Sequence, residues 1–148
     1  MNILITGARR GIGAAAYALL KKHGQRVVGH STKGSAELVA GDLMDPSAPR
    51  DIWETALAEL DGRIDVLVNN AGIYEAVADN TTDDEWHQAW TRTMTVNLQA
   101  AADLSRLAVS HFLDLGVGGR IINVTSRAAF RGDSPQHWHY AASKAAMV

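Results

Sequence analysis

The chain has 148 residues, a length sufficient for one domain with a sizeable core. Its composition, 47% hydrophobic and 20% charged residues, is that of an ordinary globular protein. Its formal net charge of −2 gives no electrostatic reason to expect nucleic acid or an anionic membrane as a partner. The absence of cysteine excludes disulfide bonds, thiolate catalysis and a cysteine-based zinc site.

Strand and helix signals alternate from the first residue. The N-terminus runs directly into an apolar segment at 3–5 without the features of a signal peptide, and no apolar stretch has the length of a membrane span, so we expect a cytoplasmic protein. A glycine cluster and a helical run follow, and Gly24 is expected to end that helix. Short strands are expected at 26–28 and 37–39, and the residues between them, 30–36, are too few for a crossover helix.

The alternation continues to the end of the chain. A helix is expected to begin at Pro46 or Pro49 and to end at Asp61 and Gly62, followed by a strand at 65–69. A long helix is expected to begin with a Thr82/Glu85 capping box and to run to about Leu115, with an interruption near Asn97. The last expected elements are a strand at 118–126 and a helix from Tyr140 onward. This order predicts a doubly wound α/β fold, with a parallel sheet covered by helices on both faces, in a single domain of residues 1–148. In such folds ligands bind beyond the carboxyl ends of the strands.

A glycine-rich turn lies between the first expected strand and the first expected helix. Its sequence is Thr6-Gly-Ala-Arg-Arg-Gly-Ile-Gly13, and glycine allows positive φ angles and a close approach of the backbone to a ligand. The helix N-terminus behind it offers free N–H groups and a positive dipole end to a diphosphate. The turn lacks the Gly-Lys-Ser/Thr ending of a Walker loop and also differs from the usual Gly-x-Gly-x-x-Gly. Its position directly after the first strand favours a nucleotide-binding turn, with a purely structural turn as the alternative.

Five short motifs together resemble the short-chain dehydrogenase/reductase family. They are, in chain order, Thr6-Gly7-x-x-x-Gly11-x-Gly13, Asn69-Asn-Ala-Gly72, Asn97, Ser126 and Tyr140-x-x-x-Lys144. The resemblance implies a Rossmann-like doubly wound sheet. It covers the whole chain but only about the first three-fifths of a usual family domain, so we expect a fold truncated after the fifth strand and the start of the Tyr/Lys helix, incomplete at its C-terminus.

The pair Tyr140 and Lys144 carries the predicted chemistry. Residues four apart share one face of a helix, and an ammonium at ~4 Å contributes roughly 4 kcal/mol toward a phenolate at an effective dielectric of ~20. The resemblance implies that Tyr140 exchanges a proton with the substrate oxygen, that Lys144 also holds the nicotinamide ribose, that Ser126 orients the substrate carbonyl, and that Asn97 links the lysine to a water chain. The alternatives are a solvated helix face for the pair, a loop-capping role for Ser126 with Thr125 in its place, and a helix cap at Asn97.

The cofactor type depends on the end of the second strand. An NAD enzyme usually has a carboxylate there, but this chain has Ser31, Thr32 and Lys33, with Arg9 and Arg10 nearby in the glycine turn. The two arginine cations and the two hydroxyls, without an acid, suit a 2′-phosphate, so we predict NADP(H) rather than NAD(H). The residues expected to contact the cofactor are Gly7, Arg9, Arg10, Gly11, Ile12, Gly13, Ser31, Thr32, Lys33, Asp42, Leu43, Asn70, Ala71, Gly72, Tyr140 and Lys144. No metal site is expected.

The sequence thus predicts an oxidoreductase that transfers a hydride between NADP(H) and an alcohol or carbonyl substrate, with Tyr140 as general acid/base. One alternative is a dinucleotide-binding module or fragment that does not turn over by itself, and another is a redox sensor. The resemblance also implies a homo-oligomer, a dimer or tetramer, if the chain is complete.

Overall fold

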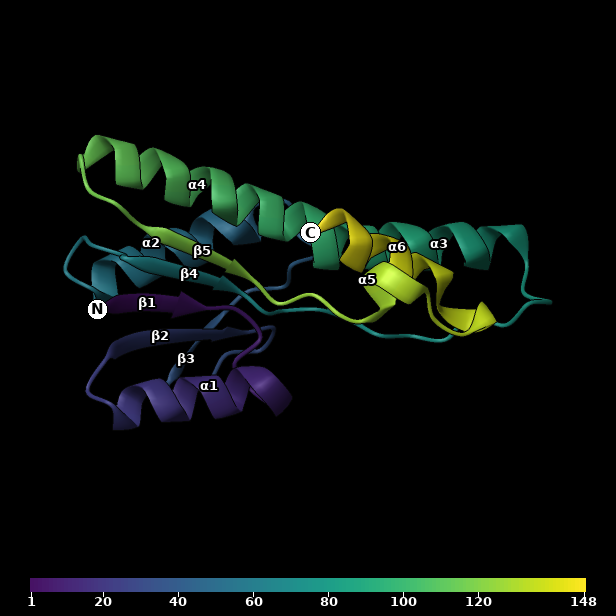
Figure 1. Cartoon of the computed structure of the whole chain (residues 1–148), viewed down its shortest axis with the longest axis horizontal. Coiled ribbons are helices and arrows are strands. Elements are labelled where there is room, and N and C mark those ends of the chain that lie inside the picture. The colour runs from purple at the N-terminus through teal and green to yellow at the C-terminus, as the bar shows by residue number, and fades with distance from the viewer.

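The computed structural model describes residues 1–148 and contains five strands and eight helical segments (Figure 1). The elements are β1 (Asn2–Ile5), α1 (Gly11–Lys22), β2 (Arg26–Ser31), β3 (Leu38–Ala40), α2 (Ala48–Glu59), β4 (Val66–Asn69), α3 (Asp83–Met94), the π-helical segment η1 (Thr95–Gln99), α4 (Ala100–Asp114), β5 (Arg120–Asn123), α5 (Ala128–Arg131), the 3-10 turn η2 (Pro135–His137) and α6 (Trp138–Ala146).

All five strands form one parallel sheet in the order β3-β2-β1-β4-β5. This is the strand order of a Rossmann-like fold, as the sequence predicted. The order reverses between β1 and β4, where Ile3 pairs with Val66. Because the strands are parallel, the loops that follow them meet at one edge, and the glycine turn after β1 lies beside the segment after β4 at this edge (Figure 1).

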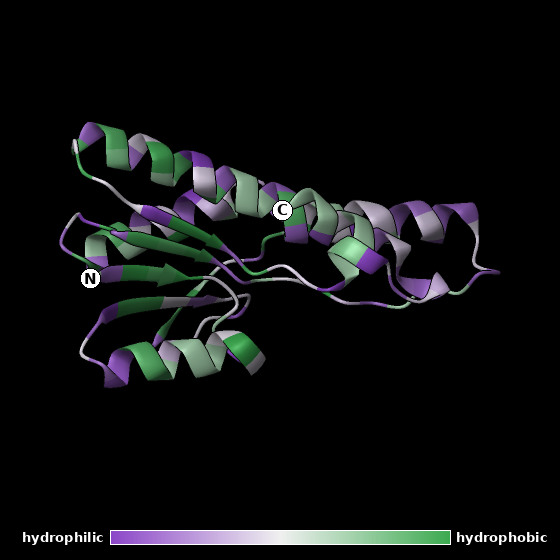
Figure 2. Ribbon diagram, viewed as in Figure 1, coloured by the Kyte–Doolittle hydropathy of each residue, from purple (hydrophilic) through white to green (hydrophobic).

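The helices cover both faces of the sheet, α1 on one face and α2 and α4 on the other (Figure 1). The middle strands are mainly hydrophobic (Figure 2), and apolar residues of these helices pack against them. On the two-helix face, Leu4 and Leu67 of the sheet pack with Ile52 of α2 and Leu104 of α4. All four side chains are buried, so this face holds the larger part of the core.

The short connection between β2 and β3 contains no helix, which confirms the sequence-based expectation. Two strands differ from the prediction. The strand β2 extends to Ser31, and β3 begins at Leu38 and ends at Ala40, one residue later than expected at each end. Parallel pairing of Gly29 with Leu38 and of Ser31 with Ala40 explains both differences, since β2 stays extended as long as it has a partner strand.

The long predicted helix is interrupted at Asn97, as expected. Thr82 and Glu85 form the predicted capping box at the start of α3, with the Glu85 amide donating to Thr82 Oγ1 at 3.3 Å. The interruption is a π-helical segment, η1, which lies between α3 and α4. Single-turn π segments of this kind occur often at functional sites.

The last part of the chain differs most from the expected elements. The strand β5 ends at Asn123 rather than at residue 126, and α5 and η2 occupy the loop that follows it. The final helix, α6, begins at Trp138, two residues before Tyr140, and packs against α3 beyond the carboxyl ends of the strands (Figure 1). No helix in the structure is both long and apolar enough to cross a membrane.

Candidate active site

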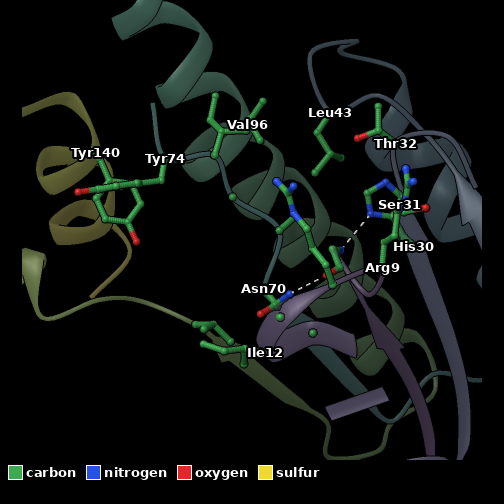
Figure 3. A pocket seen from close by; sticks show the side chains of 18 of the residues that line it. Arg9, Ile12, His30, Ser31, Thr32, Leu43, Asn70, Tyr74, Val96 and Tyr140 are labelled. Carbon is green, nitrogen blue, oxygen red and sulfur yellow. Dashed lines mark hydrogen bonds between the residues drawn. The ribbon is translucent and has the colours of Figure 1, made fainter. Parts of the chain in front are cut away.

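A cleft of about 840 Å³ lies at the carboxyl edge of the sheet (Figure 3). It runs from the glycine turn and the end of β2, past the segment after β4, to the first turn of α6. Of the sixteen residues that the sequence assigned to the cofactor, only Lys33 does not line it. The lining residues are Gly7, Arg9, Arg10, Gly11, Ile12, Gly13, His30, Ser31, Thr32, Asp42, Leu43, Met44, Asn70, Ala71, Gly72, Ile73, Tyr74, Glu75, Arg92, Val96, Val124, Thr125, Tyr140 and Lys144.

The glycine turn is closely packed, and this explains its residue types. Gly7 has a φ of +68°, and a Cβ there would lie 2.8 Å from the Ala71 Cα. A Cβ at Gly13 would lie 2.3 Å from the carbonyl oxygen of Gly7. No side chain caps the N-terminus of α1, so its first N–H groups can donate to an anion such as a diphosphate.

Thr6 and Asn70 join the glycine turn to the segment after β4. Thr6 Oγ1 accepts hydrogen bonds from the amides of Asn70 (3.1 Å) and Ala71 (3.0 Å). In return, Asn70 Nδ2 donates to the carbonyl oxygens of Thr6 (2.9 Å) and Gly7 (3.1 Å). These reciprocal bonds satisfy buried backbone groups and fix the two walls of the cleft relative to each other.

His30, near the end of β2, lines the cleft although the sequence analysis did not assign it to the site. Its Nδ1 accepts from the Gly7 amide at 3.4 Å and its Nε2 lies 2.9 Å from the Gly41 carbonyl oxygen, so the tautomer with the proton on Nε2 satisfies both contacts. Burial lowers the pKa of His30, which keeps the ring neutral. The neutral histidine therefore joins the glycine turn to the segment after β3 by hydrogen bonds.

Beyond His30, the cleft is bordered by Ser31, Thr32 and Arg9 of the glycine turn (Figure 3), and Arg10 lines it as well. Ser31 is buried, and its hydroxyl has no hydrogen-bond partner within the chain. Asp42 also lines this end, but its Oδ1 accepts from the Met44 amide at 3.0 Å within its own turn. Lys33 was predicted to contact the cofactor, but it lies outside the cleft because the chain turns away between Ser31 and Gly34, where φ is +63°.

Tyr140 and Lys144 both line the opposite end of the cleft, as their spacing on one helix face predicted. The Lys144 Nζ lies 6.0 Å from the centre of the Tyr140 ring and donates to the Val124 carbonyl oxygen at 3.0 Å, at the end of β5. Only 4% of the lysine is exposed, and this burial lowers its pKa. A lysine held in this way places its charge close to the tyrosine and to the cleft.

Asn97 is fully buried in η1 and does not itself line the cleft. Its side chain binds both backbone groups of Ile73, accepting from the amide at 2.8 Å and donating to the carbonyl at 3.0 Å. It also donates to Ser143 Oγ at 3.0 Å, and Ser143 in turn donates to the Tyr140 carbonyl oxygen at 2.8 Å. Asn97 therefore connects the cleft wall after β4 to the first turn of α6.

Ser126 does not line the cleft. It lines a separate, smaller hollow, and its Oγ accepts from the Ala128 amide at 3.2 Å, which is a loop-capping contact. Its neighbour Thr125 does line the cleft, and the Thr125 hydroxyl donates to the Lys144 carbonyl oxygen at 2.7 Å. The sequence analysis assigned Ser126 rather than Thr125 to the site. Because β5 ends at Asn123 and the following side chains no longer alternate regularly, strand periodicity does not distinguish the two residues.

Tyr74, Glu75 and Arg92 also line the cleft with Tyr140 and Lys144, and the sequence analysis did not assign them. Glu75 and Arg92 form an ion pair with a 2.9 Å contact. Tyr74 is 56% exposed, and its ring meets the Tyr140 ring nearly at right angles (83°), with 4.7 Å between their centres. No sequence signal marks Tyr74, since it is a single aromatic residue in a loop without periodicity.

The parallel sheet, the tight glycine turn in front of an uncapped helix and the cleft at the point where the strand order reverses define a Rossmann-type dinucleotide-binding protein. A model of the short chain dehydrogenase family matches residues 1–148, and the chain belongs to this family of oxidoreductases.

Individual relatives agree with this classification. The chain is 36% identical over 160 residues to "Short-chain dehydrogenase/reductase FrzI" of Cladobotryum sp, an alignment that covers 97% of the chain and 59% of the relative. Its structure resembles that of a 4-hydroxyisoleucine dehydrogenase complexed with NADH, with a TM-score of 0.85 and 26% identity over 99% of this chain and 65% of the other. It also resembles a 3-ketoacyl-(acyl-carrier-protein) reductase from Brucella melitensis complexed with NADH, with a TM-score of 0.81 and 30% identity over 97% and 64% of the two chains. The chain thus spans about three-fifths of the length of the curated relative and two-thirds of these structures.

Proposed function

We propose that the protein is an NADP(H)-dependent oxidoreductase that interconverts an alcohol and a carbonyl compound, with Tyr140 as the general acid/base. One observation carries the proposal. Tyr140 and Lys144 lie on the same cleft as the glycine turn, so a proton donor and a dinucleotide site share one cavity. A nicotinamide dinucleotide bound there would supply or accept the hydride.

The residues of the cleft fit such a cofactor. The glycine turn leaves room that any side chain would fill at Gly7 and Gly13, and the first N–H groups of α1 suit a diphosphate. In the proposed mechanism Tyr140 donates a proton to the substrate oxygen during reduction and accepts it during oxidation. The Lys144 ammonium stabilises the phenolate left on Tyr140 and is close enough to the cleft to bind a ribose hydroxyl. Asn97 holds the first turn of α6 through Ser143.

The role of Ser126 in the proposal is to hold the substrate carbonyl, as the family resemblance implies. In the structure Ser126 Oγ accepts from the Ala128 amide at the start of α5, so its O–H remains available to donate to a substrate oxygen. Thr125 is less suited to this task, because its hydroxyl is already used to hold the Lys144 backbone.

The preference for NADP(H) rests on residues of this chain, since similar solved structures contain NADH. Arg9 and Arg10 line the cleft beside Ser31 and Thr32, and no carboxylate stands at the end of β2. We expect Arg10→Ala to lower the preference for NADPH over NADH by about 10-fold to 100-fold, the equivalent of one charge-assisted hydrogen bond. Equal use of both cofactors by the unmodified protein would contradict this part of the proposal.

A second candidate is a dinucleotide-binding module that does not turn over by itself. It is favoured by the position of Ser126 outside the cleft and by the coverage of only about three-fifths of the curated relative. Fluorescence titration of the 148-residue chain with NADPH, alongside a turnover assay, separates the two candidates, because the module binds NADPH but reduces nothing. A homo-oligomer, dimer or tetramer, and a cytoplasmic location are further parts of the proposal, and light scattering and cell fractionation test them.

The main test is Tyr140→Phe, assayed with NADPH across a panel of ketones and aldehydes. We expect the substitution to lower kcat by about 100-fold to 10,000-fold, the usual contribution of general acid/base catalysis, and to leave the Kd for NADPH within about twofold. Leu113→Ala is the matched control, because Leu113 is exposed and lies far from the cleft on α4. Full activity of Tyr140→Phe would refute the proposed role.

A further inference from the structure

Tyr74 occupies a position from which it can contact the substrate. Its ring lies against that of Tyr140, and the two phenols cross in the catalytic end of the cleft (Figure 3). Since the ring centres are only 4.7 Å apart, a group attached to a carbonyl carbon that meets the Tyr140 hydroxyl comes within reach of the Tyr74 ring. Tyr74 thus lies beside the reacting atoms rather than at the distant cofactor end of the cleft.

One face of the Tyr74 ring is covered, and the other is open. The His137 ring stacks on it in parallel, with 4.0 Å between centres and an angle of 4°. His137 itself is buried, whereas 56% of Tyr74 is exposed. The exposed part of the tyrosine therefore includes the face opposite His137, and this face is a flat aromatic surface next to Tyr140.

Several contacts hold this surface in place. The Tyr74 hydroxyl donates to Asp133 Oδ1 at 3.4 Å, and Ser134 Oγ lies 2.7 Å from His137 Nδ1. The Val77 amide donates to the Gln136 carbonyl at 2.9 Å and so joins the two loops that carry the rings. A ring that is already fixed loses little conformational freedom when a second flat group stacks on it.

The geometry points to Tyr74 as a specificity-determining residue, which selects carbonyl substrates that carry an aromatic or other flat unsaturated group next to the carbonyl. This inference rests on the proposed function, since it assumes that the reacting carbonyl meets Tyr140. The open face of Tyr74 stacks with the flat group, while the carbonyl oxygen faces the Tyr140 hydroxyl. A saturated ring of the same size is thicker and lacks the π-system, so it gains less from this surface.

The test compares acetophenone with cyclohexyl methyl ketone, a flat and a saturated substrate of matched size, at saturating NADPH. We expect a higher kcat/KM for acetophenone, and we expect Tyr74→Leu to lower the ratio of the two values by about twofold to tenfold, which is the usual range for one aromatic stacking contact. Tyr74→Phe is the matched control and should keep the ratio, because it retains the ring. General damage to the fold lowers both values of kcat/KM together and leaves their ratio unchanged, so an unchanged ratio in Tyr74→Leu overturns the inference.

A binding experiment separates this inference from the proposed function. Benzamide and cyclohexanecarboxamide have the same two shapes but are not reduced, and their binding to the protein–NADPH complex can be followed by NADPH fluorescence. If benzamide binds more tightly than cyclohexanecarboxamide and Tyr74→Leu removes this difference, the inference is supported, whether or not the ketones are reduced. Absence of turnover with both ketones counts against the proposed function and not against this inference. Equal affinity for both amides overturns the inference.

Discussion

Gly13→Ala is the substitution whose effect follows most directly from the structure. A Cβ at this position would lie 2.3 Å from the Gly7 carbonyl oxygen and 2.4 Å from Asn70 Nδ2, against 3.4 Å for an ordinary contact. One of the two partners is backbone and must therefore move by about 1 Å. This shift breaks the two hydrogen bonds from Asn70 to the glycine turn, which contribute about 1 kcal/mol each.

Including the strain of the overpacked turn, we expect Gly13→Ala to lower the free energy of unfolding by about 2–4 kcal/mol. For a domain of this size that corresponds to a fall in Tm of roughly 5–15 °C. The same shift moves the N–H groups at the start of α1 and the wall after β4, so NADPH affinity should fall by about 100-fold or more, equivalent to about 3 kcal/mol. Thermal unfolding by circular dichroism and titration of NADPH fluorescence measure the two effects.

Gly24→Ala is the matched control for this experiment. Gly24 has a φ of +71°, but a Cβ there would meet nothing within 4 Å, and the residue lies at the far end of α1. We expect a loss of about 1–2 kcal/mol from the left-handed backbone conformation and no change in NADPH affinity. A Gly13→Ala protein with the Tm and NADPH affinity of the unmodified chain would refute the packing argument for the glycine turn.

Three further predictions follow from the site and its surroundings. Burial lowers the pKa of His139, so the unfolded chain binds a proton there at a higher pH than the folded protein does, and the free energy of unfolding should fall as the pH drops below about 6.5. In urea unfolding, His139→Phe should weaken this pH dependence. Burial also lowers the pKa of His30, which accounts for part of the dependence that remains. Ser126→Ala should lower kcat by about 100-fold, whereas Thr125→Val should mainly lower Tm, because its hydroxyl holds a backbone carbonyl. Lys33→Ala should leave NADPH affinity within about twofold in the fluorescence titration, since the residue lies outside the cleft.

The sequence predicted the fold well where short-range rules determine it. The length of the β2–β3 connection excluded a helix there, and Thr82 with Glu85 marked the start of α3. The interruption at Asn97 was also located correctly, although its π-helical form was not predicted. Within it, the Asn97 side chain bonds to Ile73, which lies 24 residues earlier, and a contact over this distance along the chain follows from the fold rather than from a local rule.

The details of the site that depend on loop paths could not be predicted in the same way. Lys33 is next to cleft-lining Thr32 in the sequence, but a turn at Gly34 carries it outside the cleft. The position of Tyr74 depends on two distant loops, those after β4 and β5, which are joined by the hydrogen bond from Val77 to Gln136. Such contacts between distant loops leave no periodic pattern in a single sequence.

The side chains of the motif asparagines, Asn69, Asn70 and Asn97, form hydrogen bonds that join different parts of the chain around the cleft. Asn69 Nδ2 donates to Ser105 Oγ and to Asn123 Oδ1, both at 3.0 Å, which ties the end of β4 to α4 and to β5. Asn70 ties the same segment to the glycine turn, and Asn97 ties it to α6. The loop after β4 is thus the common support of the dinucleotide end and the tyrosine end of the cleft.

This arrangement determines how damage at these positions should spread. A substitution that frees the loop after β4 displaces Gly72, and a Cβ built on Gly72 lies only 3.3 Å from Asn97 Oδ1 and 3.4 Å from Lys144 Nζ. Gly72 is thus a close neighbour of both side chains, and a shift of the loop changes the surroundings of the Lys144 ammonium as well as those of Asn97. Asparagine-to-alanine substitutions at residues 70 and 97 should for this reason weaken cofactor binding and turnover together, and their effects should be less than additive, because either one releases the same loop.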